Sequence, residues 1–159
     1  MTNAINNKIL TVVLPLKENQ EILEKFIEGN RELLTNYPLI VIGFGNLPEA
    51  RKYGISLVQT SFTLNLDSDV IIPLDFIEEA LKEFQDDKVV VISIPYESDI
   101  QGHLPFGPSL WRTEILQELY DWEFGKGDCE CRYMWEKVKS LGYKIVELDM
   151  KAKHLRRIS

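Results

Sequence analysis

Cysteines and histidines are scarce in this sequence, and their scarcity argues against several kinds of site. Only two cysteines occur among the 159 residues, Cys129 and Cys131, and one residue separates them. A disulfide framework or a four-ligand zinc site would need further partners. The chain also lacks an apolar run near the ~18 residues of a membrane span, and its N-terminus lacks the basic-then-apolar order of a signal peptide. We therefore expect a reduced, cytoplasmic protein.

Positive charge is also in short supply. The chain has 18 Lys and Arg residues against 25 Asp and Glu residues, which gives a formal net charge of −7. Because nonspecific nucleic-acid binding requires a basic surface, we expect no nucleic-acid partner. An acidic protein that binds phosphate groups needs a metal ion. The remaining composition, 45% hydrophobic and 27% charged, is typical of one globular domain.

Short apolar runs alternate with helical patterns along the chain. The expected strands lie at residues 9–14, 39–42, 61–66, 89–94 and 143–148. The expected helices lie at residues 19–34, with Gly29 as a break, and at 49–59, 76–84, 113–119 and 128–142. A long loop is expected at residues 96–108, and such loops are often functional. This order predicts a single three-layer α/β/α domain with a mixed, mostly parallel central sheet.

The strongest functional signal is an apolar strand that leads directly into Asp67, Ser68 and Asp69. In an extended backbone alternate side chains share a face, so the two carboxylates would point the same way with their Cα atoms roughly 7 Å apart. That spacing suits one Mg²⁺ or Mn²⁺ ion that also accepts phosphate oxygens. The same three residues are equally typical of a plain turn, because Asp and Ser hydrogen-bond their own backbone.

Three other features allow a functional and a structural interpretation. The strand before Asp67 carries Thr63 and Asn65 on one face, which either meets solvent or is covered by other elements. Residues 43–46, Gly-Phe-Gly-Asn, could admit a phosphate or could need a positive φ. The three tryptophans could stack on sugars or fill the core, namely Trp111, Trp122 and Trp135.

The order of these pieces resembles the GT-A-fold glycosyltransferases, especially the inverting members of family two. On the donor side the resemblance rests on residues 50–55, on 66–69 and on Pro73 with its amphipathic helix. On the acceptor side it rests on residues 107–112, 127–128 and 141–145 and on His154. It spans about residues 9–155, and it implies a nucleotide-binding half at about 9–95 and an acceptor-side half at about 96–155.

The resemblance implies metal-dependent transfer of a glycosyl group, with inversion, from a UDP- or GDP-sugar to an acceptor hydroxyl. In that family's pattern, Asp67 would contact the donor's ribose or sugar, and Asp69 would bind Mn²⁺ or Mg²⁺. His154 would match the histidine that completes the metal or diphosphate site in many relatives, and the implied metal residues are Asp67, Asp69 and His154. The donor would also meet Arg51 and the first loop, at Pro15 to Glu18.

The general base implied by the resemblance is Asp128, with Glu130 as the alternative. Asp128 is equally well placed to be the N-cap of the last helix. Relatives carry an acidic, base-recognising loop where this chain has residues 43–46, so the nucleobase is left open. The acceptor and the existence of a homo-oligomer are left open as well.

Two other classes of function compete with this interpretation. The first is a nonenzymatic module that binds a nucleotide sugar or a partner and keeps the fold without turnover. The second is a phosphatase of the haloacid dehalogenase type, in which Asp67 would be the nucleophile. The downstream Lys and later acidic pair of such phosphatases are not found at suitable places in this sequence.

Overall fold

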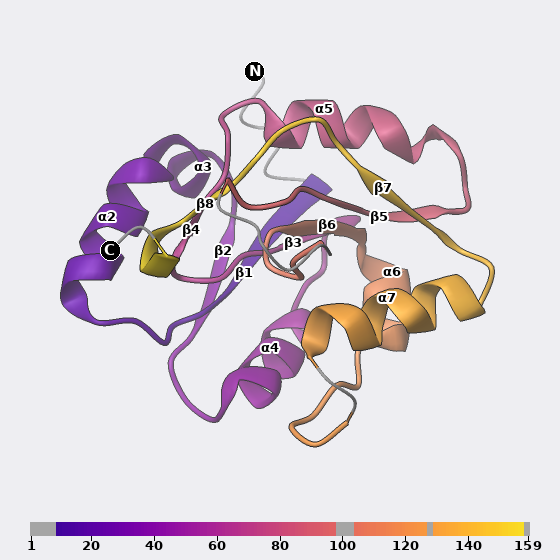
Figure 1. The fold of residues 1–159 in the computed structure, drawn as a ribbon, viewed down its shortest axis with the longest axis horizontal. Coiled ribbons are helices and arrows are strands. Elements are labelled where there is room, and N and C mark those ends of the chain that lie inside the picture. Colours follow the sequence, from indigo (N-terminus) through magenta and orange to yellow (C-terminus); the bar gives the residue numbers. More distant parts are fainter. Residues whose placement is uncertain (1–8, 98–103, 127–128, 158–159) are drawn as a thin grey trace.

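A six-stranded mixed sheet forms the centre of the computed structural model, which describes residues 9–97, 104–126 and 129–157 (Figure 1). The strands, in spatial order, are β2 (Leu39–Ile42), β1 (Leu10–Pro15), β3 (Phe62–Asn65), β6 (Ser109–Arg112), β5 (Val89–Ser93) and β7 (Lys144–Glu147). Only β6 among these runs antiparallel to its neighbours, β3 and β5, while the other neighbouring pairs are parallel. The predicted mixed, mostly parallel sheet is therefore confirmed.

Helices cover both faces of this sheet and complete the three layers. One face packs against α2 (Gln20–Gly29), α3 (Arg31–Asn36) and α5 (Phe76–Lys82), and α5 continues into a short 3₁₀ turn, η1 (Glu83–Gln85). The other face packs against α4 (Leu47–Ser56), α6 (Thr113–Leu119) and α7 (Glu130–Ser140). Successive residues of a strand point to opposite faces of the sheet. Val12 accordingly packs in the hydrophobic cluster under α2, α3 and α5, and Val13 packs in the cluster under α4, α6 and α7.

Specific residues set the start or end of two helices, and the break expected at Gly29 is confirmed. The side chain of Asn19 accepts a hydrogen bond from the Ile22 amide and caps α2. Gly29 ends that helix, and α3 begins two residues later. Asn46 and Glu49 form a reciprocal capping box at the start of α4.

The polar face of β3 is covered rather than open to solvent. Thr63 and Asn65 are both fully buried. The hydroxyl of Thr63 lies 2.7 Å from the hydroxyl of Thr113 at the start of α6. Other elements therefore cover this face, and they satisfy Thr63, whereas the buried side-chain amide of Asn65 has no hydrogen-bond partner among the described residues.

Three structural features differ from the sequence predictions. Ser109–Arg112, expected to lead straight into a helix, forms the central strand β6. The short strands β4 (Val70–Ile71) and β8 (Lys153–His154) pair antiparallel outside the main sheet and precede a 3₁₀ turn, η2 (Leu155–Arg157). The N-cap of α7 is Cys129, whose Sγ accepts from the Arg132 amide, so the prediction of an Asp128 cap was wrong.

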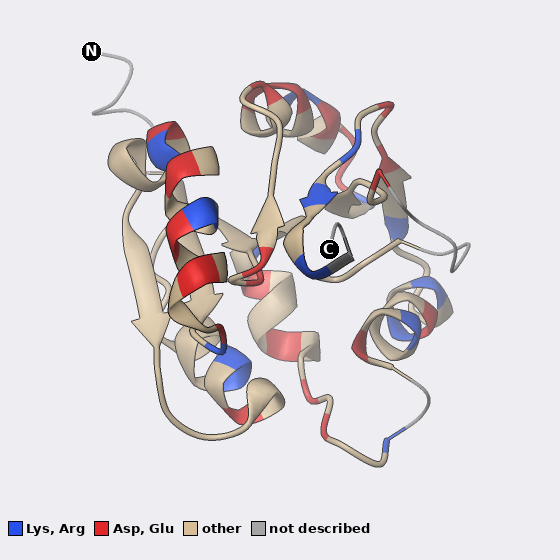
Figure 2. Ribbon diagram, turned by 60° about the vertical axis from the view of Figure 1, so that its left-hand side comes forward, with Lys and Arg blue, Asp and Glu red and all other residues tan. Residues whose placement is uncertain are grey.

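Charge is distributed over the helices without a basic face. None of the described helices carries a continuous basic stripe, and α6 carries acidic residues without Lys or Arg (Figure 2). Within the described ranges, no helix has both the length and the apolar character needed to cross a membrane. The division into two functional halves stays a prediction.

Candidate functional site

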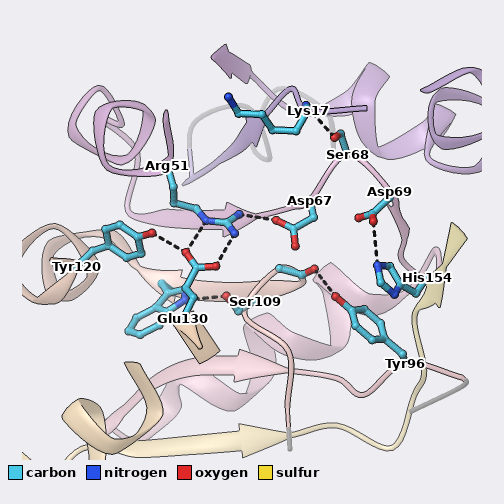
Figure 3. A network of polar contacts seen from close by, with 12 residues as sticks. Lys17, Arg51, Asp67, Ser68, Asp69, Tyr96, Ser109, Tyr120, Glu130 and His154 are labelled. Carbon is cyan, nitrogen blue, oxygen red and sulfur yellow. Dashed lines mark hydrogen bonds and ion pairs between the residues drawn. The ribbon is translucent and has the colours of Figure 1, made fainter. Parts of the chain in front are cut away.

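The carboxylate pair lies where β3 ends, beside the carboxyl end of β1. Pairing of β3 with β1 and β6 stops at Asn65, and the backbone then turns, with the Val70 amide donating to the Asp67 carbonyl at 3.1 Å. Asp67-Ser68-Asp69 is therefore a turn and not an extended segment. The prediction that both carboxylates point the same way fails, because this turn directs them to different partners (Figure 3).

Asp69 faces the C-terminal segment of the chain. Its Oδ2 atom lies 2.9 Å from Nε2 of His154. The two residues are held together by the β4–β8 pair and by the Leu155 amide, which donates to the Asp69 carbonyl at 2.8 Å. The ring of Tyr96 stacks on the imidazole, with centroids 4.5 Å apart, and its hydroxyl donates to the Gly107 carbonyl. The structure thus joins Asp69 and His154, which are 85 residues apart in sequence.

Asp67 has a different partner, a fully buried arginine. Nη1 of Arg51 lies 2.7 Å from Oδ1 of Asp67. Nε and Nη2 of Arg51 bind both carboxylate oxygens of Glu130, at 3.0 and 2.7 Å. The Tyr120 hydroxyl donates to Glu130 at 2.5 Å, and the Phe106 ring lies 5.0 Å from the guanidinium carbon. One guanidinium therefore bridges two carboxylates from distant parts of the chain.

The electrostatics of this cluster favour a permanent charge on Arg51. Burial opposes that charge, but the carboxylates of Asp67 and Glu130 hold the pKa of Arg51 well above its ordinary value. Burial, reinforced by Glu130, raises the pKa of Tyr120, so its phenol stays protonated and remains a donor. Burial also raises the pKa of Asp67, an effect that Arg51 opposes. Arg51 and its partners thus hold Asp67 in one orientation.

A close backbone contact also positions Asp67. A Cβ atom placed on Gly107 would lie 2.8 Å from Cγ of Asp67, a separation that real side chains do not adopt. The segment before β6 can approach the carboxylate this closely only because residue 107 is glycine. Gly107 is therefore part of the wall of the site.

Glu18 and Arg156 close the site beside Asp69. Nε and Nη2 of Arg156 bind the two carboxylate oxygens of Glu18, at 2.8 and 2.7 Å. The same Nε atom lies 3.7 Å from Oδ2 of Asp69. In the same loop as Glu18, the Lys17 amide donates to the Ser68 hydroxyl at 3.3 Å. The loop after β1 is thus linked to both the carboxylate turn and the C-terminal segment.

The other predicted site residues occupy diverse positions. Pro15 is the last residue of β1, where it pairs with Ile42. Glu130 begins α7, with both carboxylate oxygens bound as described. Asp128 lies outside the described residues. In the loop at residues 43–46, Gly45 has a φ of +76°, which supports the structural interpretation of that loop.

Aromatic residues contribute mainly to the core. All three tryptophans are buried, and each indole N–H has an acceptor, which favours the core interpretation over sugar stacking; the acceptors belong to Ser109, Lys126 and Leu104 for Trp111, Trp122 and Trp135. Sequence reasoning missed the roles of Tyr96, Phe106 and Tyr120. The first two fall in the segment flagged as a functional loop, whereas nothing local distinguishes Tyr120.

The residues around Asp69 fit a divalent metal ion only in part. Within the described part of the chain, no group of three or more His, Cys, Asp or Glu residues is arranged to hold a metal. Asp69 and His154 do supply one carboxylate and one imidazole, and Oδ2 of Asp69 lies 2.9 Å from Nε2 of His154. Nδ1 of His154 is buried and has no hydrogen-bond partner among the described residues. Two protein ligands suffice for an ion that takes its remaining ligands from water and phosphate oxygens.

A mixed sheet of this order with an acidic turn at the end of β3 defines a GT-A-type glycosyltransferase fold. Residues 17–137 match the family described as Glycosyl transferase family 2, and the chain therefore belongs to this family. The matched range contains Asp67 and Asp69 but not His154. Membership favours the glycosyltransferase interpretation over the phosphatase alternative.

Solved structures support the same fold. A mannosyltransferase from Pyrobaculum calidifontis, in complex with GDP-Man and Mn²⁺, is similar with a TM-score of 0.74 at 13% identity, over 92% of this chain and 56% of that one. S. aureus TarS in complex with UDP-GlcNAc is similar with a TM-score of 0.64 at 12% identity, over 91% of this chain and 57% of that one. A mutant Drosophila β1,4-galactosyltransferase 7 in complex with manganese, UDP-Gal and xylobiose is similar with a TM-score of 0.64 at 11% identity, over 92% of this chain and 70% of that one.

Length separates this chain from some of those proteins. It spans 56% of the mannosyltransferase and 57% of the TarS chain. The search of curated proteins found no match. The comparisons therefore define the family and the fold.

Proposed function

We propose that this protein transfers a glycosyl group from a nucleotide-diphosphate sugar to an acceptor hydroxyl, in a metal-dependent reaction that inverts the anomeric centre. The observation that carries the proposal is the Asp69–His154 pair, 2.9 Å apart beside Asp67 at the end of β3, in a chain of family 2. Ligands of open α/β sheets bind outside the carboxyl ends of the strands, where this group lies.

Asp69 and His154 would hold Mn²⁺ or Mg²⁺ at the donor site. A bound divalent ion supplies charge stabilisation for the leaving nucleoside diphosphate. Asp67, on the same turn, would contact the donor's ribose or sugar and border the metal. Arg51 is fully buried, so it would serve the donor by orienting Asp67 rather than by touching the nucleotide.

Asp128 is favoured over Glu130 as the general base that takes the acceptor's proton. Both oxygens of Glu130 are bound by Arg51, and one also accepts from Tyr120. A base needs a free lone pair within hydrogen-bond reach of the acceptor hydroxyl. Glu130 would then position Arg51, and through it Asp67. Pro15 and Glu18 would shape the first donor loop.

A binding and transfer experiment tests this proposal. The melting temperature is measured with UDP, GDP and their sugar conjugates, each with and without Mn²⁺, because a ligand of the folded state raises it. Hits are then incubated with candidate acceptors, and the anomeric configuration of the product is read by NMR. We expect a Mn²⁺-dependent shift and an inverted product. Binding without transfer would favour the nonenzymatic module, and retention would contradict the inverting mechanism.

The donor sugar, the acceptor and a homo-oligomeric state stay open in this proposal. UDP- and GDP-sugars are both included because residues 43–46 carry no acidic side chain that would select a base. The cytoplasmic location expected from the sequence stays a prediction.

A further inference from the structure

The central sheet has two edge strands, and the chain protects them differently. In the part of the chain that the structure describes, β2 forms one edge and β7 the other (Figure 1). β7 begins with Lys144 and ends with Glu147, both exposed, and the ammonium of Lys144 lies 3.0 Å from the carboxylate of Asp86. Charged side chains of this kind keep an edge strand from pairing with another chain. β2 has the sequence Leu-Ile-Val-Ile and carries no such charge.

The lack of charge extends beyond β2 on both sides. Residues 33–48 are the longest run of the sequence without Asp, Glu, Lys or Arg, in a chain with a net charge of −7. Two copies of an acidic protein repel one another, and an uncharged run is where that repulsion is weakest. A basic partner would find no carboxylate in this run. The charge pattern therefore favours a second copy of this chain as the partner of β2.

The outer side of β2 presents backbone hydrogen-bonding groups. The carbonyls of Pro38 and Ile42 accept hydrogen bonds from the β1 side, at 2.9 Å each. Because alternate residues of a strand direct their backbone groups to opposite sides, Leu39 and Val41 direct theirs outward. Their side chains are 38% and 45% exposed. Among the described strands, only β1 pairs with β2, so these outward groups have no partner strand.

Exposed apolar side chains border this edge on the side of α4. The helix lies directly over β2, since a Cβ atom placed on Gly54 would lie 3.4 Å from the Ile42 side chain. Tyr53 on α4 and Leu57 at its end are exposed, and the Tyr53 ring lies 5.5 Å from the exposed ring of Phe44. A pair of four-residue strands is marginal on its own, so these side chains supply the additional apolar area that a contact needs.

We propose that two copies of this chain associate through β2, which pairs antiparallel with β2 of the second copy about a twofold axis. In the register that pairs the whole strand, Ile40 faces Ile40 of the second copy, and Leu39 faces Val41 of the second copy. Each Leu39–Val41 pair then exchanges two backbone hydrogen bonds. The assembly closes at two copies, because the outer edges of the joined sheet are the charged β7 strands. This inference does not depend on the proposed transfer activity.

Measurements of the oligomeric state test the inference. Sedimentation equilibrium and light scattering give the mass over a range of protein concentrations for wild type, Val41→Pro, Val41→Lys and Leu74→Lys. Proline at residue 41 removes the outward N–H group and leaves the bonds to β1 in place, whereas lysine adds a charge to the edge. Leu74→Lys is the matched control, because Leu74 is 76% exposed and lies outside β2 and α4. Melting temperatures show whether each variant is folded.

We expect wild type to form dimers in the micromolar range. Val41→Pro and Val41→Lys should raise the dimer dissociation constant about tenfold or more, because each change occurs twice in a symmetric pair. Leu74→Lys should match wild type. If Val41→Pro failed to fold, Val41→Lys would decide the question.

A cysteine cross-link tests the register of the proposed pair. The Cα atoms of Ile40 in the two copies should lie about 4.5 Å apart, which is within the range of a disulfide. Under mild oxidation Ile40→Cys should therefore give a disulfide-linked dimer on a nonreducing gel, whereas wild type and Lys144→Cys should stay unlinked.

Three results would overturn the inference, and all of them would leave the proposed function intact. The first is a wild type that stays monomeric throughout the micromolar range. The second is a dimer that neither Val41 substitution weakens, which would place the contact elsewhere. The third is a folded, dimeric Ile40→Cys protein that forms no cross-link, which would exclude the antiparallel register.

Discussion

Asp67 and Asp69 are one residue apart, yet they are held by different parts of the chain. Arg51 on α4 holds the first, and His154 on β8 holds the second. In the proposed reaction the first carboxylate faces the donor and the second binds the metal. Each role can therefore be removed by a substitution that leaves the other residue's partner in place.

The first prediction concerns the metal. Asp69→Asn should abolish the Mn²⁺-dependent rise in melting temperature caused by UDP or GDP, because an amide removes the anionic ligand from the site. Asp75→Asn is the matched control, since Asp75 is exposed and its side chain makes no cap hydrogen bond to α5. The measurement is the change in melting temperature caused by UDP or GDP, with and without Mn²⁺. If folded Asp69→Asn showed the same Mn²⁺-dependent change as wild type, Asp69 would not be a metal ligand.

The second prediction separates the two acidic residues near the start of α7. Asp128→Asn should lower transfer by about 10²–10⁴-fold, the usual contribution of a general base, with little change in stability. Glu130→Gln should instead lower the free energy of unfolding by about 3–5 kcal/mol, because it leaves the fully buried Arg51 without its buried carboxylate partner. Transfer at saturating donor and chemical denaturation are measured on both variants. A stable Glu130→Gln protein that alone lost turnover would reverse the assignment.

At the scale of elements, the segment that leads into β6 positions the end of β3. The third prediction is that Gly107→Ala weakens donor binding, since the new methyl group would displace Asp67 from its place beside Arg51. Gly43→Ala is the control, because a Cβ atom there would meet nothing within 4 Å and its φ is not positive. Calorimetry with UDP or GDP and Mn²⁺ makes the comparison. Equal affinities in the two variants would show that Asp67 tolerates the shift.

Elements with a strong local pattern could be predicted from the sequence, and those defined by distant partners could not. β1 and α5 are set by their own apolar spacing, and both appear as expected. β6 has only four residues after Pro108, and its place is fixed by β3 and β5 on either side. No local sequence pattern predicts the position of β6 in the sheet.

The residues of the candidate site also fall into those that could be predicted from the sequence and those that could not. The Asp67-Ser68-Asp69 turn and His154 could be singled out from residue types and from their order in the chain. The bond between Arg51 and Glu130 joins residues 79 apart, and only the three-dimensional arrangement of α4 and α7 reveals it. The direction of each carboxylate also depends on such partners, which is why the extended interpretation of the turn failed.

At the scale of the whole molecule, the two predicted halves share one sheet. β5 belongs to the first half, at residues 9–95, but its described neighbours in the sheet are β6 and β7 of the second half. The gap between β3 and β5 is filled by β6. One half can therefore bind the donor and the other the acceptor, although the two halves are not independent folding units.

The fourth prediction follows from this shared sheet. A fragment of residues 1–95 should not fold alone, because β5 would have no partner strand and β3 would have an unpaired edge. The intact chain should unfold in a single calorimetric transition. Circular dichroism and calorimetry of the fragment and the intact chain provide the measurement. A cooperatively folded fragment would show that the first half is a domain in its own right.

The position of β6 also bears on how the chain is made. During synthesis at about 5–20 residues per second, β3 and β5 emerge before the strand that must be inserted between them. Until Ser109–Arg112 has left the ribosome, β3 has an unpaired edge, and β5, whose sequence is Val-Val-Val-Ile-Ser, lacks β6 as its neighbour. The sheet closes late, through contacts distant in sequence, and such closure is slow. The last strand to join the middle of the sheet thus sets the interval in which the nascent protein is exposed to aggregation and in need of chaperones.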